Sequence, residues 1–312
     1  MTSIKISKPA LGKEPLYKNL LKELKRLKIS PHENLGQHSL IDKSVIDFLA
    51  QSVSPGNTVI EVGAGVGQLT EALAEKAGKV ISIEIDRRYE PVLTQIAKQH
   101  PNIQIIFGDA IALNLQDLMP KQRDGERIQI VSNLPFHIAE PFLHKIAGLP
   151  IESATLVVGE KLARAIQALN EESIDFGQLT LLAETFFDID VISEVEKQKS
   201  FPVPRTDSAI IRLIPKEEYE FRSSRRDFLL RRLFLTAKRS PLAKNCLKEG
   251  LIEFERVRQM GTLSKKEHNQ LTQNQTRAII EKMGIPDDIL DKPFEQLNNN
   301  ELRLLSKALR LV

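Results

Sequence analysis

The tetrapeptide Asn133-Leu134-Pro135-Phe136 is the part of this sequence whose residue types most directly suggest chemistry. It follows the apolar run 128–131, which is typical of a buried strand. The amide oxygen of Asn133 can accept a hydrogen bond from an exocyclic amine. Pro135 lacks an N–H and fixes the turn, so that nearby carbonyls can face the same amine, and Phe136 can stack on a flipped-out base. The segment therefore predicts an enzyme that modifies the amino group of a nucleobase, although an ordinary turn followed by a core Phe has the same residues.

A glycine-rich turn lies about 70 residues earlier, between a strand-like run and a helical pattern. Gly63, Gly65 and Gly67 have the spacing G-x-G-x-G, which is one residue shorter than the dinucleotide-binding G-x-G-x-x-G. Glycine lets the backbone turn sharply and approach a ligand closely. Glu61 precedes the first glycine, and a carboxylate there is poorly suited to a pyrophosphate. It suits a cofactor that carries a sulfonium and an ammonium group, namely S-adenosylmethionine.

Two further carboxylates follow the next two predicted strands. Glu84 ends the run 79–85, and Asp109 follows the run 103–107. Open α/β sheets bind ligands at the carboxyl ends of their strands. Glu84 is placed to accept from the ribose hydroxyls and Asp109 from the adenine amine. Each acid alone could be a helix cap or a solvated loop residue, but three at successive strand ends, in an order that matches one cofactor, favour binding.

The elements that must position these residues alternate along the chain, which predicts an α/β fold with a doubly wound, Rossmann-like, mostly parallel sheet. Two late strands, 184–195 and 209–214, have no convincing helix between them and are expected to form an antiparallel hairpin at the sheet edge. The other expected strands are 58–62, 79–85, 103–107, 128–131 and 154–158, and the expected helices are 68–76, 88–99, 138–147 and 160–169.

Strand signals stop after Pro215, and a small helical domain is expected to follow. Its helices are predicted at 226–237, 242–254, 274–283 and 300–311. At the other end of the chain, leucines at positions 16, 20, 24 and 27 predict a helix in a Lys-rich arm. The domains are therefore predicted as a basic arm at 1–32, a cofactor-binding domain at 33–217 and a helical domain at 218–312.

Charge is distributed unevenly, although the net charge is only +3. Residues 1–32 carry eight Lys/Arg and two Glu, and residues 216–312 carry twenty basic and fourteen acidic residues. The stretch between them has 16 basic and 25 acidic residues, a net charge of −9. Basic ends on an acidic body indicate a polyanionic partner, although solvated helix faces would give the same count.

Composition excludes several other classes of protein. No apolar run approaches the roughly 18 residues that span a bilayer, and no signal-peptide core is visible. The single Cys246 excludes an intramolecular disulfide and a multi-Cys metal site, which favours a reducing compartment. The six His lack a metal-binding spacing such as HExxH. We therefore expect a cytoplasmic protein without a catalytic metal.

Five short motifs follow one another in order: Gly36-Gln37-His38-Ser39-Leu40-Ile41-Asp42, the turn Glu61–Gly67, Ile83-Glu84-Ile85-Asp86, Gly108-Asp109-Ala110 and Asn133-Leu134-Pro135-Phe136. This series resembles the ribosomal RNA adenine dimethyltransferases, which include small-subunit dimethyladenosine transferases and large-subunit erythromycin-resistance methyltransferases. The segment 201–209 resembles the small-subunit sequence FxPxPxVDSAVV. The resemblance covers about residues 33–215.

The resemblance implies S-adenosylmethionine as cofactor and N6 of adenine in ribosomal RNA, most of all small-subunit RNA, as the methyl acceptor. It implies a monomer that acts on ribosomal RNA or a pre-ribosomal particle. His38, Ser39 and Phe136 stand where the family usually has Asn, Phe and Tyr, which leaves the RNA target and the number of methyl groups open. By residue, it implies cofactor contacts at Gln37, His38, Leu40, Gly63, Glu84 and Asp109, and both catalysis and a cofactor contact at Asn133.

The helical domain is then expected to bind RNA phosphates through a basic segment, residues 221–248, that holds nine Lys/Arg and one Asp. The candidate residues are Arg222, Arg225, Arg226, Arg231, Arg232, Lys238 and Arg239.

Three alternatives remain open. One is a large-subunit methyltransferase of the resistance type. The second is a DNA adenine methyltransferase, which usually has Asp in place of Asn133. The third is an RNA-binding assembly or transcription factor that retains the cofactor fold without turnover.

Overall fold

The computed structural model of this chain describes residues 15–32, 36–119, 127–168, 173–217, 221, 223–236, 239, 241–259 and 272–310. The chain divides into two compact units. The sheet unit contains the described residues up to 163 together with 189–215, and the helical unit contains those in 164–188 and from 216 onward. The helical unit thus includes a segment that lies within the predicted cofactor-binding domain.

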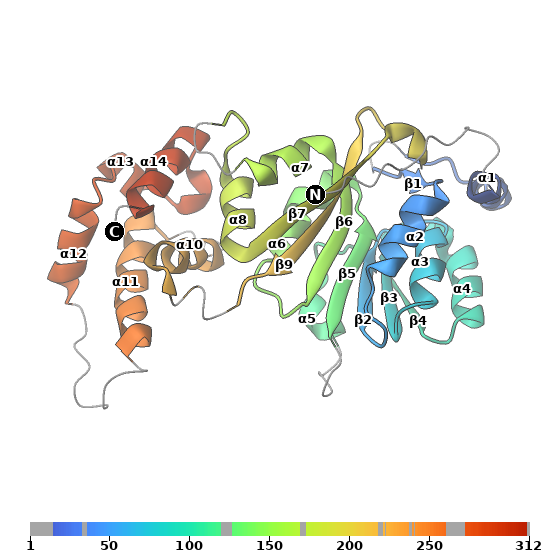
Figure 1. Cartoon of the computed structure of the whole chain (residues 1–312), viewed down its shortest axis with the longest axis horizontal. Helices are drawn as coiled ribbons and strands as arrows, with labels where there is room; N and C mark the ends of the chain where they lie inside the picture. The colour runs from blue at the N-terminus through green and yellow to red at the C-terminus, as the bar shows by residue number, and fades with distance from the viewer. Residues whose placement is uncertain are drawn as a thin grey trace. The chain divides into compact units, whose positions relative to one another are not determined.

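A seven-stranded sheet forms the centre of the sheet unit (Figure 1). The strand order is β4-β3-β2-β5-β6-β9-β7. The first five strands pair in parallel and β9 is antiparallel to β6, which confirms the predicted mostly parallel sheet with an antiparallel edge. The strands are β2 Thr58–Val62, β3 Lys79–Glu84, β4 Ile103–Phe107, β5 Ile128–Asn133, β6 Ser153–Gly159, β7 Phe187–Val195 and β9 Ser208–Pro215.

The register of the parallel strands brings the predicted functional residues to one edge of the sheet. Glu84 pairs opposite Phe107, and Asn133 pairs opposite Val157. β5 continues two residues beyond the predicted run 128–131, so Asn133 is the last residue of this strand. The carboxyl ends of β2, β3, β4 and β5 therefore meet where the glycine turn, both later carboxylates and the Asn follow them.

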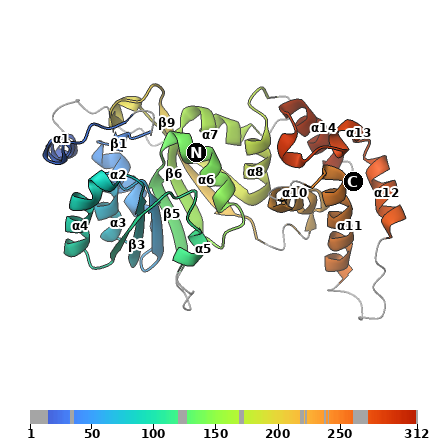
Figure 2. The same cartoon turned by 180° about the vertical axis from the view of Figure 1, so that it is seen from behind.

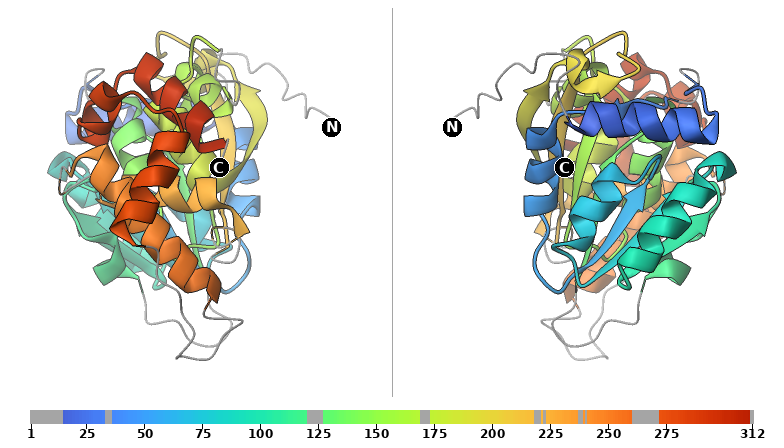
Figure 3. Two further views of the ribbon diagram at one scale, coloured as in Figure 1. Left: turned by 90° about the vertical axis from the view of Figure 1, so that its left-hand side faces the viewer. Right: turned by 90° about the vertical axis from the view of Figure 1, so that its right-hand side faces the viewer.

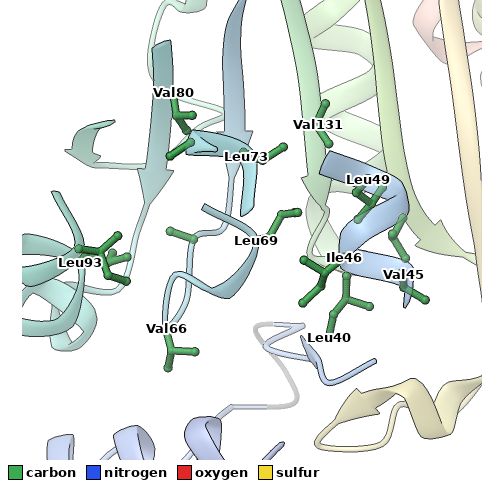
Figure 4. Packing of buried hydrophobic residues seen from close by; sticks show 14 of the residues in the cluster. Leu40, Val45, Ile46, Leu49, Val66, Leu69, Leu73, Val80, Leu93 and Val131 are labelled. Carbon is green, nitrogen blue, oxygen red and sulfur yellow. The ribbon is translucent and has the colours of Figure 1, made fainter. Parts of the chain in front are cut away.

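The core on one face of the sheet is formed by alternate strand residues and by three helices (Figure 4). Val59, Val80 and Val131 project to this face, where Leu49, Leu73 and Leu93 pack with them. The helices are α2 Lys43–Gln51, α3 Gln68–Ala74 and α4 Glu90–Gln99, the last preceded by a 3₁₀ turn at Arg87–Tyr89. Because both faces are covered, β2, β3 and β5 are buried along almost their whole length instead of showing an alternation of buried and exposed residues.

The opposite face buries Ile60, Ile81 and Ile130. Helix α6, Ala139–Ile146, contributes the buried Phe142 and lies on the side seen in Figure 2. The short helix α5, Leu115–Leu118, precedes β5, the 3₁₀ turn Phe136–Ile138 precedes α6, and α7, Glu160–Gln167, follows β6.

Helix α1, Pro15–Leu27, confirms the helix predicted in the basic arm. Leu20 and Leu24 are buried in the same core as α2 and α3, so α1 belongs to the sheet unit. The right-hand view of Figure 3 shows α1 as the dark blue helix that crosses above α3 and α4.

One predicted strand starts later than expected, and one helix beside the site was not predicted. The strand expected from residue 184 begins only at Phe187, because helix α8, Gln178–Phe186, occupies the first part of that run. Residues 180–183 and 185–186 are all buried, and an apolar run without a polar face does not distinguish a helix from a strand. Helix α2 was not predicted, although Asp42 caps it by accepting from the backbone N–H groups of Ser44 and Val45.

The late strands β7 and β9 are neighbours at the sheet edge, but a short excursion separates them in sequence. It contains a 3₁₀ turn at Lys197–Lys199 and strand β8, Ser200–Phe201. β8 pairs antiparallel with β1, Ser39–Leu40, in a separate two-stranded sheet. The excursion therefore reaches the segment that carries the first motif, residues 36–42.

The helical unit contains the second half of α7, the whole of α8 and the described helices that follow residue 216. Leu229, Leu233, Leu247, Leu251 and Leu305 lie in its core, which explains the leucine spacing of these segments. The helices are α10 Arg225–Thr236, α11 Ala243–Gln259, α12 Gln273–Lys282, α13 Asp287–Leu290 and α14 Asn299–Arg310, with a 3₁₀ turn at Phe294–Gln296.

Two properties of the described residues bear on membranes and metals. Among the described residues, none of the helices combines the length and apolarity that a membrane span needs. Within the same part of the chain, no cluster of three or more His, Cys, Asp or Glu side chains could hold a metal ion. Cys246 is buried and free.

Candidate active site

A cavity opens at the carboxyl ends of β2, β3, β4 and β5. All nine residues predicted to bind the cofactor line this cavity, together with Pro135 of the predicted catalytic turn. They are Gln37, His38, Leu40, Glu61, Gly63, Gly65, Glu84, Asp109 and Asn133. The structure thus brings together residues from five motifs that are spread over about a hundred positions.

The glycine turn forms the floor of this cavity beside the catalytic turn. Gly63 and Gly65 have φ values of +82° and +55°, a region that residues with a Cβ rarely adopt. A Cβ on Gly63 would lie 3.2 Å from Cγ of Pro135. Glycine at this position therefore serves both the turn and the close approach of the two segments.

Glu84 connects the glycine turn to the end of β3. Its Oε2 accepts from the backbone N–H of Gly65 at 2.8 Å, and its Oε1 accepts from that of Asp86 at 2.8 Å. Burial raises the pKa of Glu84, and these hydrogen bonds oppose the rise. Each carboxylate oxygen retains capacity for a further hydrogen bond, so Glu84 can shape the turn and still accept from a ligand.

Glu61 is the most buried of the three carboxylates, with 1% of its surface exposed. Its Oε2 accepts from Thr70 Oγ1 and from Ser82 Oγ, each at 2.6 Å. Burial raises the pKa of Glu61 to about 7, although the two hydroxyl groups oppose this shift, and the charge of Glu84 adds to it. A cationic group in the cavity would favour the ionised form of this carboxylate.

Asp109 lies at the open rim of the cavity, and its side chain is exposed. Its Oδ1 accepts from the backbone N–H of Ile111 at 2.8 Å, which fixes the side chain at the start of the following turn. The second carboxylate oxygen can accept from a ligand.

The side chain of Asn133 is oriented by the first motif. Its Nδ2 donates to the carbonyl of His38 at 2.6 Å. Because this bond uses the donor end of the amide, the remaining end is an acceptor. Leu134 is buried, and its N–H donates to the carbonyl of Val157 at 3.1 Å, so the neighbouring strand β6 holds the turn.

Phe136, the fourth residue of the predicted catalytic turn, is not among the residues that line the cavity. It is half-buried, and its ring lies 5.7 Å from that of His38, at an angle of 35° between the planes. A Cβ on Gly159 would lie 3.7 Å from the Phe136 ring. The aromatic face is therefore placed beside the cofactor cavity instead of within it.

The segment 36–42 is held between the catalytic turn and the segment 199–202. The His38 ring contacts the Pro202 carbonyl through Nδ1 at 2.7 Å, and the Ile41 N–H donates to the Lys199 carbonyl at 2.8 Å. Lys199 Nζ lies 3.5 Å from Asp42 Oδ2, and their side chains are only 1% and 8% exposed. We call these contacts the loop clamp.

The sequence did not reveal the loop clamp, because its two halves are far apart in the chain and most of its bonds involve backbone groups. Gln37 was predicted to bind the cofactor, and its side chain also donates to Asp86 Oδ2 at 3.0 Å. Hydrogen bonds from Arg88 lower the pKa of Asp86 to about 2. Tyr89, Gln68 and Ile85 also line the cavity and were not predicted, although the last follows Glu84 directly.

The arginines predicted to bind RNA lie in the helical unit, and the structure gives most of them internal partners. Arg225 pairs with Glu255 at 3.2 Å, and Arg226 pairs with Glu184 at 3.0 Å. Arg232 pairs with Glu253 at 2.6 Å and with Glu249 at 3.0 Å. Arg231 lies 4.3 Å above the Phe221 ring, Arg239 is exposed, and Arg222 and Lys238 lie outside the described residues.

Known proteins resemble this chain in sequence and in fold. Residues 29–283 match the family described as ribosomal RNA adenine dimethylase. The ribosomal RNA small subunit methyltransferase A of Alkaliphilus oremlandii (strain OhILAs) is 30% identical over 213 residues, which cover 67% of this chain and 71% of that protein. The protein of the same name from Bacillus cytotoxicus is 28% identical over 284 residues, which cover 89% of this chain and 90% of that protein.

A solved structure, a dimethyladenosine transferase from Plasmodium falciparum, has a TM-score of 0.53 to this chain at 23% identity. The match covers 86% of this chain and 96% of that chain. It supports the fold described above.

Proposed function

Because this chain belongs to the ribosomal RNA adenine dimethylase family, we propose that it transfers methyl groups from S-adenosylmethionine to N6 of adenines in small-subunit ribosomal RNA. The observation that carries the proposal is the single cavity in which three strand-end carboxylates, the glycine turn and Asn133 meet. The named relatives, which are small-subunit methyltransferases, support the choice of RNA. In this proposal the protein acts as a cytoplasmic monomer on ribosomal RNA or a pre-ribosomal particle.

The residues of the cavity fit S-adenosylmethionine. Glu84 and Asp109 retain acceptor capacity, which suits ribose hydroxyls and the adenine amine respectively. Gly63 and Gly65 expose bare backbone to the ligand, and the buried Glu61 is favoured in its charged form by a cation. When bound, this cofactor supplies a methyl group that its sulfonium has already activated.

The catalytic turn holds the target base in the proposed reaction. Asn133, whose amide nitrogen is occupied by His38, accepts one N–H of the adenine amine through its oxygen. The Leu134 carbonyl accepts the other, and these bonds favour a more tetrahedral nitrogen with an available lone pair. Phe136 stacks on the extruded base.

Positioning supplies most of the acceleration, because the amine only needs to be held in line with the methyl group. No dedicated base is required: once the new N–C bond has formed, the nitrogen is strongly acidic and its proton leaves. The loop clamp keeps the carbonyl of His38 in place, and with it the orientation of Asn133.

The decisive experiment is transfer of labelled methyl groups to naked ribosomal RNA, 30S particles and 50S particles, followed by mapping of the modified adenines. We expect label on N6 of small-subunit adenines, with two methyl groups on each. Label confined to 50S particles would contradict the small-subunit assignment. Cofactor binding without label on any RNA would contradict the enzymatic assignment and favour a binding factor.

A further inference from the structure

Helix α1 is firmly attached to the sheet unit, although it comes from a Lys-rich arm. Leu20 and Leu24 are 1% and 6% exposed, and Ile29 beyond the helix is 6% exposed. Leu16, Tyr17 and Leu27 pack against the same core. The charged face of α1 is therefore held in a fixed position relative to the sheet.

The first turn of α1 lies next to the rim of the cavity. The Leu16 carbonyl accepts from Gln68 Nε2 at 2.9 Å, and Gln68 lines the cavity at the start of α3. The Tyr17 ring meets the Phe201 ring edge to face, with centroids 5.4 Å apart. Phe201 belongs to β8, whose partner β1 also lines the cavity.

The outer face of α1 is a lysine stripe, formed by Lys18, Lys22 and Lys25. All three side chains are exposed, and their i, i+4, i+7 spacing places them on one side of the helix over about 10 Å. None of the three forms an ion pair with a carboxylate in the described part of the chain. The one acid of this helix, Glu23, is already paired with Arg26 at 2.6 Å.

The charge of this stripe contrasts with its surroundings in sequence, because residues 33–215 have a net charge of −9. A basic stripe that precedes an acidic stretch of the chain, beside the entrance to a base-modifying site, is suited to a polyanion that must enter that site. RNA is such a polyanion, and lysine binds phosphates as a point charge without reading the base.

We propose that the lysine stripe of α1 binds phosphates of the RNA strand next to the target adenine, an inference that rests on the proposed function. The stripe adds affinity and fixes the approach of the strand, and it takes no part in the transfer of the methyl group. Its expected signature is a contribution to RNA affinity that depends on salt and not on base sequence.

The test compares two full-length double variants that each remove two positive charges from the sheet unit. The stripe variant is Lys18→Gln/Lys22→Gln. The control variant is Lys76→Gln/Lys98→Gln; both lysines are exposed and lie near the ends of α3 and α4, at the opposite edge of the sheet from the cavity. Binding to naked small-subunit ribosomal RNA and to 30S particles is measured over a series of salt concentrations, alongside cofactor affinity and thermal melts.

We expect the stripe variant to bind naked RNA about tenfold more weakly in low salt and to lower the slope of log K against log[salt] by about 1.4–1.8, as two lost phosphate contacts require. Single-turnover methylation at saturating RNA, cofactor affinity and melting temperature stay at wild-type values, and the control variant keeps the wild-type slope. An unchanged slope in the stripe variant, or an equal change in the control, would overturn the proposal.

Two further outcomes separate this proposal from neighbouring ones. A loss of affinity for 30S particles without a loss for naked RNA would assign the stripe to a ribosomal protein and overturn the RNA contact. A wild-type protein that neither binds nor methylates any ribosomal RNA would refute the proposed function itself, whatever the stripe variant does.

Discussion

The two units of this molecule each contain a basic helix, α1 in the sheet unit and α10 in the helical unit, and these helices use their charged side chains in opposite ways. In the helical unit, Arg225, Arg226 and Arg232 on α10 meet carboxylates from α8 and α11. In the sheet unit, the lysine stripe and Asp109 are exposed, and Glu84 retains acceptor capacity toward the cavity. α1 and α10 are both basic helices, yet only α10 lies beside helices whose carboxylates pair with its basic side chains. The number of basic side chains on a helix therefore does not show whether they bind a ligand or stabilise the fold. The position of nearby carboxylates does distinguish the two roles.

The paired arginines of α10 and the lysines of the stripe differ in their energetic contribution because they differ in exposure to solvent. The Arg226 side chain is 14% exposed and that of Glu184 is 19% exposed, so removing one partner leaves a charge that water reaches poorly. The stripe lysines are hydrated, and their removal costs the fold little. Changes in the lysine stripe and at Glu84 or Asn133 should thus affect ligands and turnover, and changes in the α10 pairs should affect stability.

The largest effect on turnover is expected at a neutral polar group of the catalytic turn. We expect Asn133→Ala to lower single-turnover methyl transfer at saturating RNA by about 10²–10³-fold, the usual cost of one preorganised hydrogen-bonding group in an active site. Cofactor affinity and thermal stability should change little. Full activity in a folded variant would remove this turn from the chemistry.

Removal of Glu84 tests whether a carboxylate of the cavity serves a ligand. We expect Glu84→Ala to weaken S-adenosylmethionine binding by about 3 kcal/mol, because charged hydrogen bonds are lost. Calorimetry measures the affinity. Since Glu84 also accepts from Gly65 and Asp86, a melt of the same variant must show that the sheet unit is folded; unchanged affinity in such a protein would contradict the assignment.

The raised pKa of Glu61 predicts that this buried carboxylate lowers the free energy of unfolding when it ionises. Its pKa is about 7 in the folded protein, above the ordinary 4.5, so the folded state binds more protons between these values and stability falls as pH rises. Between pH 5 and 8 the free energy of unfolding of wild type should fall relative to Glu61→Gln by about 2–3 kcal/mol. Denaturant unfolding of both proteins at both pH values measures this; a difference independent of pH would show that the carboxylate is ionised throughout.

The α10 pairs provide the complementary test, with the smallest expected effect. Arg226→Leu should lower the free energy of unfolding by about 2 kcal/mol, less than for a fully buried pair because both side chains retain some exposure. The double variant Arg226→Leu/Glu184→Leu should recover part of the loss, because Asp227 and Arg310 then each lose an ion pair as well. Cofactor affinity should stay unchanged in both. If Arg226→Leu instead weakened RNA binding without a loss of stability, the contrast between the units would fail.

The sequence was informative where local patterns determine structure. The apolar runs that became β2–β6 are bounded by glycines and acids, and their order along the chain indicated that their carboxyl ends would share one edge. The last three residues of α8, 184–186, were mistaken for the start of a strand, because the buried residues of this helix present no polar face.

The remaining features depend on distant contacts. The loop clamp joins residues 36–42 to 199–202, mainly through carbonyls and N–H groups that every sequence possesses. The acids that pair with Arg226 and Arg232 lie at 184 and at 249–253, so no local pattern marks those arginines as structural. The same lack of local information kept the exposed lysines of α1 from being distinguished from the paired arginines of α10.

The loop clamp also sets an order of events during synthesis. The His38 ring and the Pro202 carbonyl are separated by 164 positions. At about 5–20 residues per second, roughly 8–33 s pass between synthesis of the first motif and synthesis of the segment that holds it. The glycine turn and the strands that carry Glu61, Glu84 and Asp109 are all made within that interval. The part of the cavity that is translated first is therefore the part that is completed last, and a growing chain released before residue 202 lacks the contact with Pro202 that holds the His38 segment, whose carbonyl orients Asn133.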